Sequence, residues 1–199
     1  EGKILYREVK RRKAIFQTGS QQRSTANFHR AVLLLRNGHV GRLKRVEVGL
    51  PKGYTEPGAS AEISPVPSNL NYDLWSGPAP LLPYMRARHH RFWRGHRAYG
   101  GGNIMDWIGH HNDIAHWGAG MDASGPEEVE AIGWTQSSTD VYDTPVDYEI
   151  RCVYPGGVDW VIASQLPMGT RWIGEEGWVA VDRGKLTASD ERWTRPDYD

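Results

Sequence analysis

The stretch that most constrains the fold of this chain runs from residue 99 to residue 120, YGGGNIMDWIGHHNDIAHWGAG. Three glycines lead into an apolar run whose spacing predicts a helix ended by Gly118 and Gly120. With about 3.6 residues per turn, one stripe of this helix carries Asp106, His110, Asp113 and Trp117. The opposite side, which we expect to face a core, carries Ile104, Ile108 and Ala115. An acid and a histidine on a largely apolar helix are costly to bury unless they pair or do chemistry, so this helix is the predicted site.

Size and composition bound the class of protein. The 199 residues, 39% hydrophobic and 24% charged, indicate one globular domain with a substantial core. The 24 basic and 24 acidic residues balance, which argues against nucleic acid as the main partner. No apolar run reaches membrane-spanning length and the N-terminus does not resemble a signal peptide, so no membrane partner is expected and the cytoplasm is the default compartment. A single cysteine, Cys152, excludes an internal disulfide.

The first part of the chain alternates predicted helix and strand. Residues 3–12 form an amphipathic pattern, and residues 14–20 are typical of a buried strand, as at the end of an α/β layer. A helix is expected from the capping residue Ser24 to about Arg36, followed by a strand over residues 43–50. Residues 51–83 are rich in proline, glycine, serine and asparagine, which predicts a long irregular excursion that includes NYDLWSGPAP.

The rest of the chain is rich in predicted strands. They cover residues 127–136, 145–154 and 157–166, and two further strands, TRWIG and GWVAVDRG, complete a meander. Tight turns are expected at residues 155–157 and 175–177. Consecutive hairpins predict an α+β fold, a mainly antiparallel open sheet with helices packed on one face. The residues after Leu186 are polar and are expected to be poorly ordered.

Four segments carry a resemblance to known proteins: FQTGSQQRS, AVLLLRNGHVGRLKRVEVGLP, PVPSNLNYDLWSGPAPLLPY and GGGNIMDWIGHHNDIAHWGAGMDASGPEEVEA. In this order and spacing they resemble the glucose–fructose oxidoreductase/inositol dehydrogenase/MocA (Gfo/Idh/MocA) family, over about residues 15–136. The resemblance implies an N-terminal Rossmann domain that binds NAD or NADP in full-length relatives, and a C-terminal α/β domain whose open sheet commonly forms an oligomer interface. It also implies oxidation or reduction of a sugar or cyclitol hydroxyl.

The departures from the family pattern concern the cofactor. The chain contains neither G-x-G-x-x-G nor the family's Glu-Lys-Pro motif. We therefore expect a truncated relative: residues 1–23 as the remnant of the last Rossmann helix and strand, 24–190 as the C-terminal α/β domain, and 191–199 as a polar tail. No cofactor is expected for this chain alone.

The resemblance assigns roles to the predicted helix. Asp106 and His110 match the family's Asp-x-x-x-His pair, which implies that His110 is the general base and that Asp106 orients its ring. Without the resemblance, a pair at this spacing is more typical of a helix surface than of a catalytic site. Asp113 near these residues also fits a divalent metal, but no third strong ligand has a defined spacing, so no metal is predicted.

Further residues are candidates for contact with substrate or cofactor. Arginine and tryptophan suit sugars, through hydrogen-bond forks and ring stacking. The predicted substrate-binding residues are His89, His90, Arg91, Trp93, Arg94, Trp107, His111 and Asp113. For the basic cluster among them, a solvated loop is an equal alternative. Gln22 and Arg23 follow the first predicted strand and would border the cofactor in a complete enzyme.

Two classes of function remain open from the sequence. The first is an oxidoreductase of the sugar type that needs a dinucleotide site from another segment or polypeptide. The second is a cofactor-free module for carbohydrate binding or oligomerisation. In either case we expect a homo-oligomer, because strands that alternate apolar and polar residues leave a sheet face to be covered by another subunit.

Overall fold

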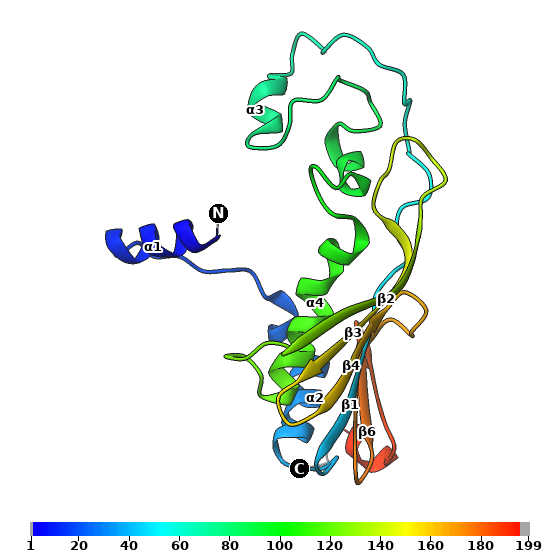
Figure 1. The fold of residues 1–199 in the computed structure, drawn as a ribbon. Helices are drawn as coiled ribbons and strands as arrows, with labels where there is room; N and C mark the ends of the chain where they lie inside the picture. Colours follow the sequence, from blue (N-terminus) through cyan, green and yellow to red (C-terminus); the bar gives the residue numbers. More distant parts are fainter. Residues whose placement is uncertain (1, 196–199) are drawn as a thin grey trace.

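The computed structural model describes residues 2–195 and is built around one mixed sheet of seven strands, with the helices α2 and α4 against one face (Figure 1). The strands are β1 (Leu43–Gly49), β2 (Glu128–Gln136), β3 (Pro145–Tyr154), β4 (Val158–Ala163), β5 (Gly169–Gly174), β6 (Trp178–Asp182) and β7 (Lys185–Ala188). The helices are α1 (Gly2–Arg12), α2 (Ala26–Arg36), α3 (Tyr72–Ser76) and α4 (Gly102–Ala119), with short 3-10 turns η1 (Gln21–Ser24), η2 (His90–Gly95) and η3 (Glu191–Thr194). The predicted α+β architecture, a mainly antiparallel open sheet with helices on one face, is confirmed.

The strand order is β2-β3-β4-β1-β5-β6-β7. Strands that follow one another in the sequence pair antiparallel, as expected for hairpins, except where β1 lies between β4 and β5. There β1 runs parallel to β4, with Val46 beside Trp160 and Val48 beside Ile162. A parallel pair needs a long crossover, and here the excursion and α4 provide it.

The core lies between the sheet and the two helices. Alternate residues of the central strands point to the helices, among them Val46, Val48, Trp160, Ile162 and Trp172. Ile114 and Ala115 of α4 are fully buried against them, and Ile104 and Ile108 pack at the edge of the same cluster. The predicted core-facing side of α4 is therefore confirmed.

Gly118 lies inside α4 and does not end it, which corrects the expectation from sequence. A Cβ atom at Gly118 would stand 2.6 Å from Cζ2 of Trp172, so only glycine lets the helix approach the sheet this closely. The Trp172 indole donates a hydrogen bond to the carbonyl of Ala115 at 3.1 Å. The helix ends at Gly120, whose φ of 70° is left-handed.

Two expectations about the N-terminal part are wrong. Residues 14–20 form no strand and are exposed, because a strand needs a neighbour for its backbone hydrogen bonds and the described residues place none beside them. Helix α1 forms as predicted, with none of its described side chains buried, and extends away from the sheet (Figure 1). Helix α2 begins after Thr25, because Ser24 belongs to η1.

The expected polar tail is also partly wrong. Residues 185–188 form the edge strand β7, and residues 191–194 form η3. The reason is Trp193, whose buried indole packs into the main core beside the ring of His39 at 5.5 Å. Residues 196–199 of that tail lie outside the described residues.

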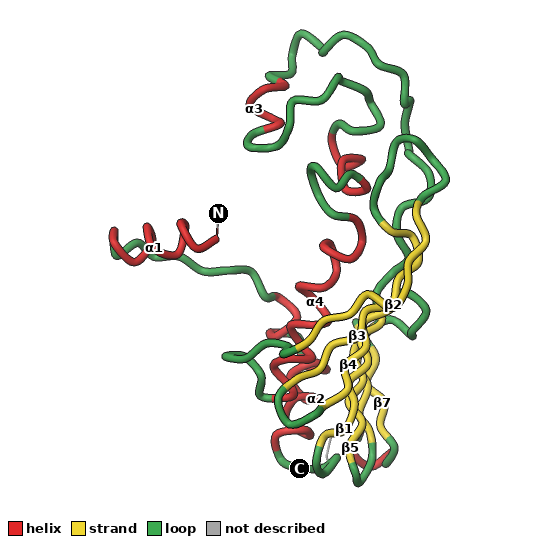
Figure 2. Tube along the Cα trace, viewed as in Figure 1, coloured by secondary structure: helices red, strands yellow, loops and turns green. Residues whose placement is uncertain are grey.

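Residues 51–100, which we call the arm, connect β1 to α4 and extend beyond the end of the sheet. The arm is mostly loop, as predicted, and contains only α3 and η2 as helical segments (Figure 2). It returns to the body at the N-terminal half of α4. Among the described residues, no helix is both long and apolar enough to cross a membrane.

The close approach at Gly118 makes a matched prediction possible. Gly118→Ala should lower the free energy of unfolding by about 1–3 kcal/mol, because the new methyl group overpacks Trp172. Gly109→Ala, on the same helix with open space around its Cβ, should raise it by up to about 1 kcal/mol through helix propensity. Urea unfolding followed by circular dichroism measures both. Equal effects of the two substitutions would contradict the packing role of Gly118.

Candidate functional site

The candidate site lies along the exposed side of α4, where the arm and η1 meet the helix. The arm contacts the N-terminal half through η2, and η1 contacts the middle. The site therefore combines segments from three separate parts of the chain, residues 21–24, 51–100 and 102–119.

Asp106 is held by two donors from the arm. The Tyr54 hydroxyl donates to Oδ2 at 2.7 Å, and Arg94 Nη1 donates to Oδ1 at 2.8 Å. Burial, together with the bond to Asp106, raises the pKa of Tyr54 to about 12, so the phenol remains a donor at neutral pH. The carboxylate is therefore fixed in orientation and paired with a charge.

His110 lies one helical turn beyond Asp106 and is half-buried. Its Nδ1 lies 3.3 Å from Nε2 of Gln21 in η1, and the edge of its ring meets Trp107 at 5.6 Å between centroids. Burial, reinforced by the charge of Arg183, lowers the pKa of His110 below its ordinary value, against the opposing charges of Asp106 and Asp113. The imidazole is therefore neutral at pH 7 and able to accept a proton.

The resemblance implies that Asp106 orients the ring of His110. Within the described part of the chain, no hydrogen bond or ion pair joins the two side chains, because the carboxylate turns to Tyr54 and Arg94. Asp106 still acts on the histidine through its charge, which favours the protonated imidazole. In this structure Asp106 therefore acts on His110 through its charge, without a direct bond between the two side chains.

Arg23 forms a hydrogen-bonded cluster with two acids. Its guanidinium donates to both carboxylate oxygens of Asp113 at 2.8 Å and to Asp122 at 2.7 Å. The hydrogen bond with Asp113 raises the pKa of Arg23, and its guanidinium lies over the ring of Trp117 at 5.3 Å. Arg23 and Asp113 thus form a pair in this structure, and their roles in cofactor and substrate binding stay predictions.

Gln22 is also internal. Its side chain is buried, and its amide nitrogen donates to the carbonyl of His110 at 3.1 Å while Arg183 donates to its oxygen at 3.1 Å. A side chain whose hydrogen bonds are formed in this way ties η1 to α4. That Gln22 borders the cofactor in a complete enzyme stays a prediction.

His111 and Trp107 belong to a stacked, largely covered group. His111 is 0% exposed, and burial lowers its pKa to about 4, so the ring is neutral. The indole of Trp107 stacks on His111 at 5.8 Å, and the Arg183 guanidinium lies 4.7 Å from the indole. His111 therefore lies in the core of the protein, and the Trp107 indole lies between His111 and Arg183. Substrate contact by either residue stays a prediction.

The basic aromatic segment is divided between two cavities of the arm. Arg94 and Arg91 line a cavity of about 370 Å³ beside Asp106, together with Tyr54 and Tyr142. Trp93 instead lines a separate pocket of about 500 Å³. His89 packs its ring against Trp75, Tyr84 and His90, and burial lowers the pKa of His89 below its ordinary value.

Sequence reasoning missed several residues of this site. Tyr54, Gln21 and Arg183 contact the predicted pair or its neighbours but come from loops or strand ends with no periodic pattern. Only the position of Gln21 beside the predicted Gln22 gave a signal. Among residues 2–195, no cluster of three or more histidine, cysteine, aspartate or glutamate side chains is placed to hold a metal ion.

Comparisons with known proteins agree with this fold. An NAD-binding oxidoreductase from Klebsiella pneumoniae aligns with 99% of this chain and 48% of its own, at 16% identity and a TM-score of 0.58. The aldose-aldose oxidoreductase from Caulobacter crescentus aligns with 87% of this chain and 47% of its own, at 17% identity and a TM-score of 0.54. The WlbA dehydrogenase from Bordetella pertussis, solved with NADH and UDP-GlcNAcA, aligns with 89% of this chain and 46% of its own, at 19% identity and a TM-score of 0.52.

At these identities the likeness shows the fold, and this chain spans about half the length of each of these proteins. No curated protein sequence matches the chain significantly. The family model described as the C-terminal alpha/beta domain of the oxidoreductase family matches residues 47–165, more than half of the chain. The chain therefore belongs to the Gfo/Idh/MocA family of oxidoreductases and contains its C-terminal α/β domain.

Proposed function

We propose that this chain supplies the substrate-binding and proton-transfer half of an NAD(P)-dependent sugar or cyclitol oxidoreductase. The observation that carries the proposal is the neutral, half-buried imidazole of His110 at the junction of α4 and η1. A neutral imidazole at this point takes the proton of a substrate hydroxyl. The Asp106 charge, held by Tyr54 and Arg94, then stabilises the imidazolium that forms.

Gln21 selects which nitrogen of His110 is basic. A side-chain amide that turns its oxygen to Nδ1 keeps the proton there and leaves Nε2 free to accept another. In this structure the amide nitrogen faces Nδ1. In that orientation it donates to the Nδ1 lone pair and the ring proton lies on Nε2, so this hydrogen bond has to break before Nδ1 accepts the substrate proton. A shallow depression of about 300 Å³ lies on the same side and includes Gln21, Ser20 and Ser24. This depression lies on the η1 side of the histidine, and the cavity beside Asp106 lies on the arm side.

We infer that the dinucleotide is held by another segment or polypeptide, because the two residues expected beside it are paired within this chain. Gln22 is buried and hydrogen-bonded to the carbonyl of His110, and the guanidinium of Arg23 is hydrogen-bonded to Asp113 and Asp122. The triple glycine at residues 100–102 follows loop and not a strand, so it lacks the context of a phosphate-binding turn. The proposal therefore assigns hydride acceptance to a dinucleotide site from another segment or polypeptide.

The first test replaces the proposed base. His110→Ala should lower kcat for sugar oxidation by about 100-fold or more, because general-base catalysis is lost. The assay joins this chain to the Rossmann half of a full-length family member and follows NADH formation with a panel of aldoses and cyclitols. His29→Ala, an exposed histidine on α2, is the matched control.

Unchanged kcat in the His110 variant would rule out the proposed base. Proton NMR of the chain alone gives a second reading, because a bound polyol should shift the imidazole signal of His110 and not that of His29. A polyol that binds while kcat does not depend on His110 would favour the alternative function, a cofactor-free carbohydrate-binding module.

The second test concerns the cofactor. The chain by itself should show no change in melting temperature and no fluorescence change with NAD or NADP, because it contains no G-x-G-x-x-G turn to bind the pyrophosphate. A submicromolar binding signal for either dinucleotide would contradict this division of labour.

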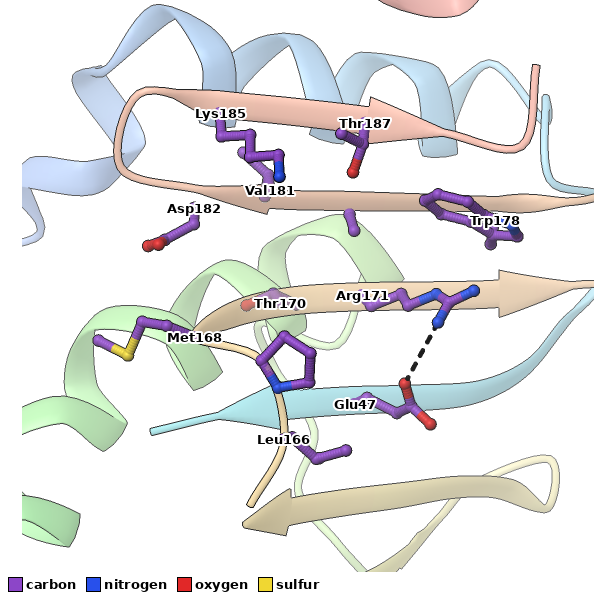
Figure 3. A pocket seen from close by; sticks show the side chains of 12 residues that line it. Glu47, Leu166, Met168, Thr170, Arg171, Trp178, Val181, Asp182, Lys185 and Thr187 are labelled. Carbon is purple, nitrogen blue, oxygen red and sulfur yellow. Dashed lines mark ion pairs between the residues drawn. The ribbon is translucent and has the colours of Figure 1, made fainter. Parts of the chain in front are cut away.

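The open face of the sheet bears on the expected oligomer. Its central strands carry a row of ion pairs, here called the charge ladder, where the sequence predicted apolar surface. In the ladder Arg151 pairs with Asp159 at 3.3 Å, and Asp159 also pairs with Arg45. Arg45 pairs with Glu47 at 2.9 Å, and Glu47 pairs with Arg171 at 3.9 Å. Figure 3 shows one end of this ladder, where Glu47 and Arg171 meet. Alternating charges on a broad surface are self-complementary when two copies meet face to face.

The proposed homodimer through this face gives a salt-dependent prediction. Light scattering should show a dimer at low ionic strength that dissociates near 1 M salt, where the screening length falls to about 3 Å. Glu47→Lys should weaken the dimer, whereas Glu8→Lys on the remote helix α1 should not. A monomer at low salt would count against the interface.

A further inference from the structure

The turn between β6 and β7 brings a charged side chain, Arg183, to the candidate site, where the proposed proton transfer assigns it no part. The turn consists of Arg183 and Gly184, and Gly184 closes it with a left-handed φ of 82°. Asp182 and Lys185 pair across its base, at the end of the hairpin that Figure 3 shows. The Asn27 side chain of α2 donates to the carbonyl of Asp182, so the turn is anchored to a helix of the body.

Arg183 is connected to His110 through two shared neighbours. Its Nε donates to Oε1 of Gln22 at 3.1 Å, and Nε2 of the same glutamine donates to the carbonyl of His110 at 3.1 Å. The guanidinium carbon lies 4.7 Å from the centre of the Trp107 indole, and the His110 imidazole meets that indole at 5.6 Å between centroids. A positive charge therefore lies close to the imidazole.

The guanidinium is held in this position although Arg183 belongs to an exposed turn. The acceptor of its hydrogen bond, Gln22, is only 3% exposed, so the bond forms at the edge of the core. A guanidinium over an indole face gains a further electrostatic attraction. Two contacts of different kinds thus fix the charge on the side of α4 that carries Trp107 and His110.

The charges around His110 have opposite signs. The carboxylates of Asp106 and Asp113 favour the protonated imidazole, whereas the guanidinium of Arg183 opposes protonation. Each carboxylate is paired with an arginine from the arm or from η1. Among the described residues, Arg183 forms no such pair with an acid, so its charge stays unneutralised. The other charged or titratable groups at this junction are His111, Asp182, Tyr54, Arg94 and Arg23.

An unneutralised positive charge at this place matters for a general base. A base has to be uncharged before it takes a proton, and a nearby positive charge disfavours the imidazolium. It therefore increases the fraction of molecules in which the imidazole is ready to react near neutral pH. A neutral residue in place of Arg183 would leave the two carboxylates without this opposing charge.

We propose that Arg183 is a positioning residue whose charge keeps His110 unprotonated and ready to accept the substrate proton. The inference rests on the role proposed for His110. It adds the turn between β6 and β7 to a site otherwise built from α4, η1 and the arm.

The test is an NMR titration of the histidine signals of the chain at low salt, where exposed charges are least screened. The His110→Ala variant assigns the signal of His110. Arg183→Gln removes the charge but retains a donor for Gln22, and it should raise the proton affinity of His110 roughly two- to fivefold. Arg183→Lys retains the charge and should restore most of the difference.

Arg42→Gln is the matched control. Arg42 pairs with Glu175 at the opposite end of β5 from the turn, so the same loss of charge there should leave the proton affinity of His110 unchanged. If Arg183 only held its neighbours in place, the Gln and Lys variants would lower the melting temperature alike and the titration would not separate them. That result, an unchanged titration in Arg183→Gln, or an equal change in Arg42→Gln would each overturn the proposal.

The pH profile of the chain joined to a Rossmann half links the titration to the reaction. In Arg183→Gln the acid limb of kcat should move to higher pH, in step with the proton affinity of His110. The titration itself needs no turnover. A kcat that does not depend on His110 would therefore overturn the proposed function, whereas an unchanged titration would overturn the role of Arg183.

Discussion

The site depends on how α4 is fixed against the sheet. The Thr170 hydroxyl donates to the carbonyl of His111 at 2.7 Å, and the Trp172 indole donates to that of Ala115, over the gap that Gly118 leaves. Such bonds from sheet side chains to helix backbone set the rotation of the helix as well as its distance. With one face held in this way, the stripe that carries His110 has to face η1 and the arm.

The arm completes the site by supplying partners for Asp106. A carboxylate on a largely apolar helix is stable only when it is paired, and Tyr54 and Arg94 provide the pairing from a segment that has little regular structure of its own. The same segment carries the aromatic pocket around Trp93 and Ser76. The two features are joined at η2, where Trp93 faces the pocket and the next residue binds the acid.

The helix and its functional stripe could be predicted because they follow from local periodicity and from a motif. The side chains that contact that stripe could not be predicted, because they come from distant parts of the chain. The sequence grouped His111 with the half-buried His110, although one position on a helix turns a side chain by about 100° and here moves it into the core. It assigned Gln22 and Arg23 to a cofactor, whereas complementary groups on α4 and Asp122, far away in sequence, satisfy them. Tyr54 left no pattern to find.

By itself, the sequence determined the helices α2 and α4, six of the strands and the turns between them, because period, glycine and proline act within a few residues. The turn at Gly156 and Gly157, both with positive φ, is one example. Tertiary structure alone decided that β1 enters between β4 and β5, that residues 14–20 stay without a strand partner, and that Trp193 anchors the end of the described chain. These outcomes depend on contacts between residues far apart in the sequence, which no local pattern encodes.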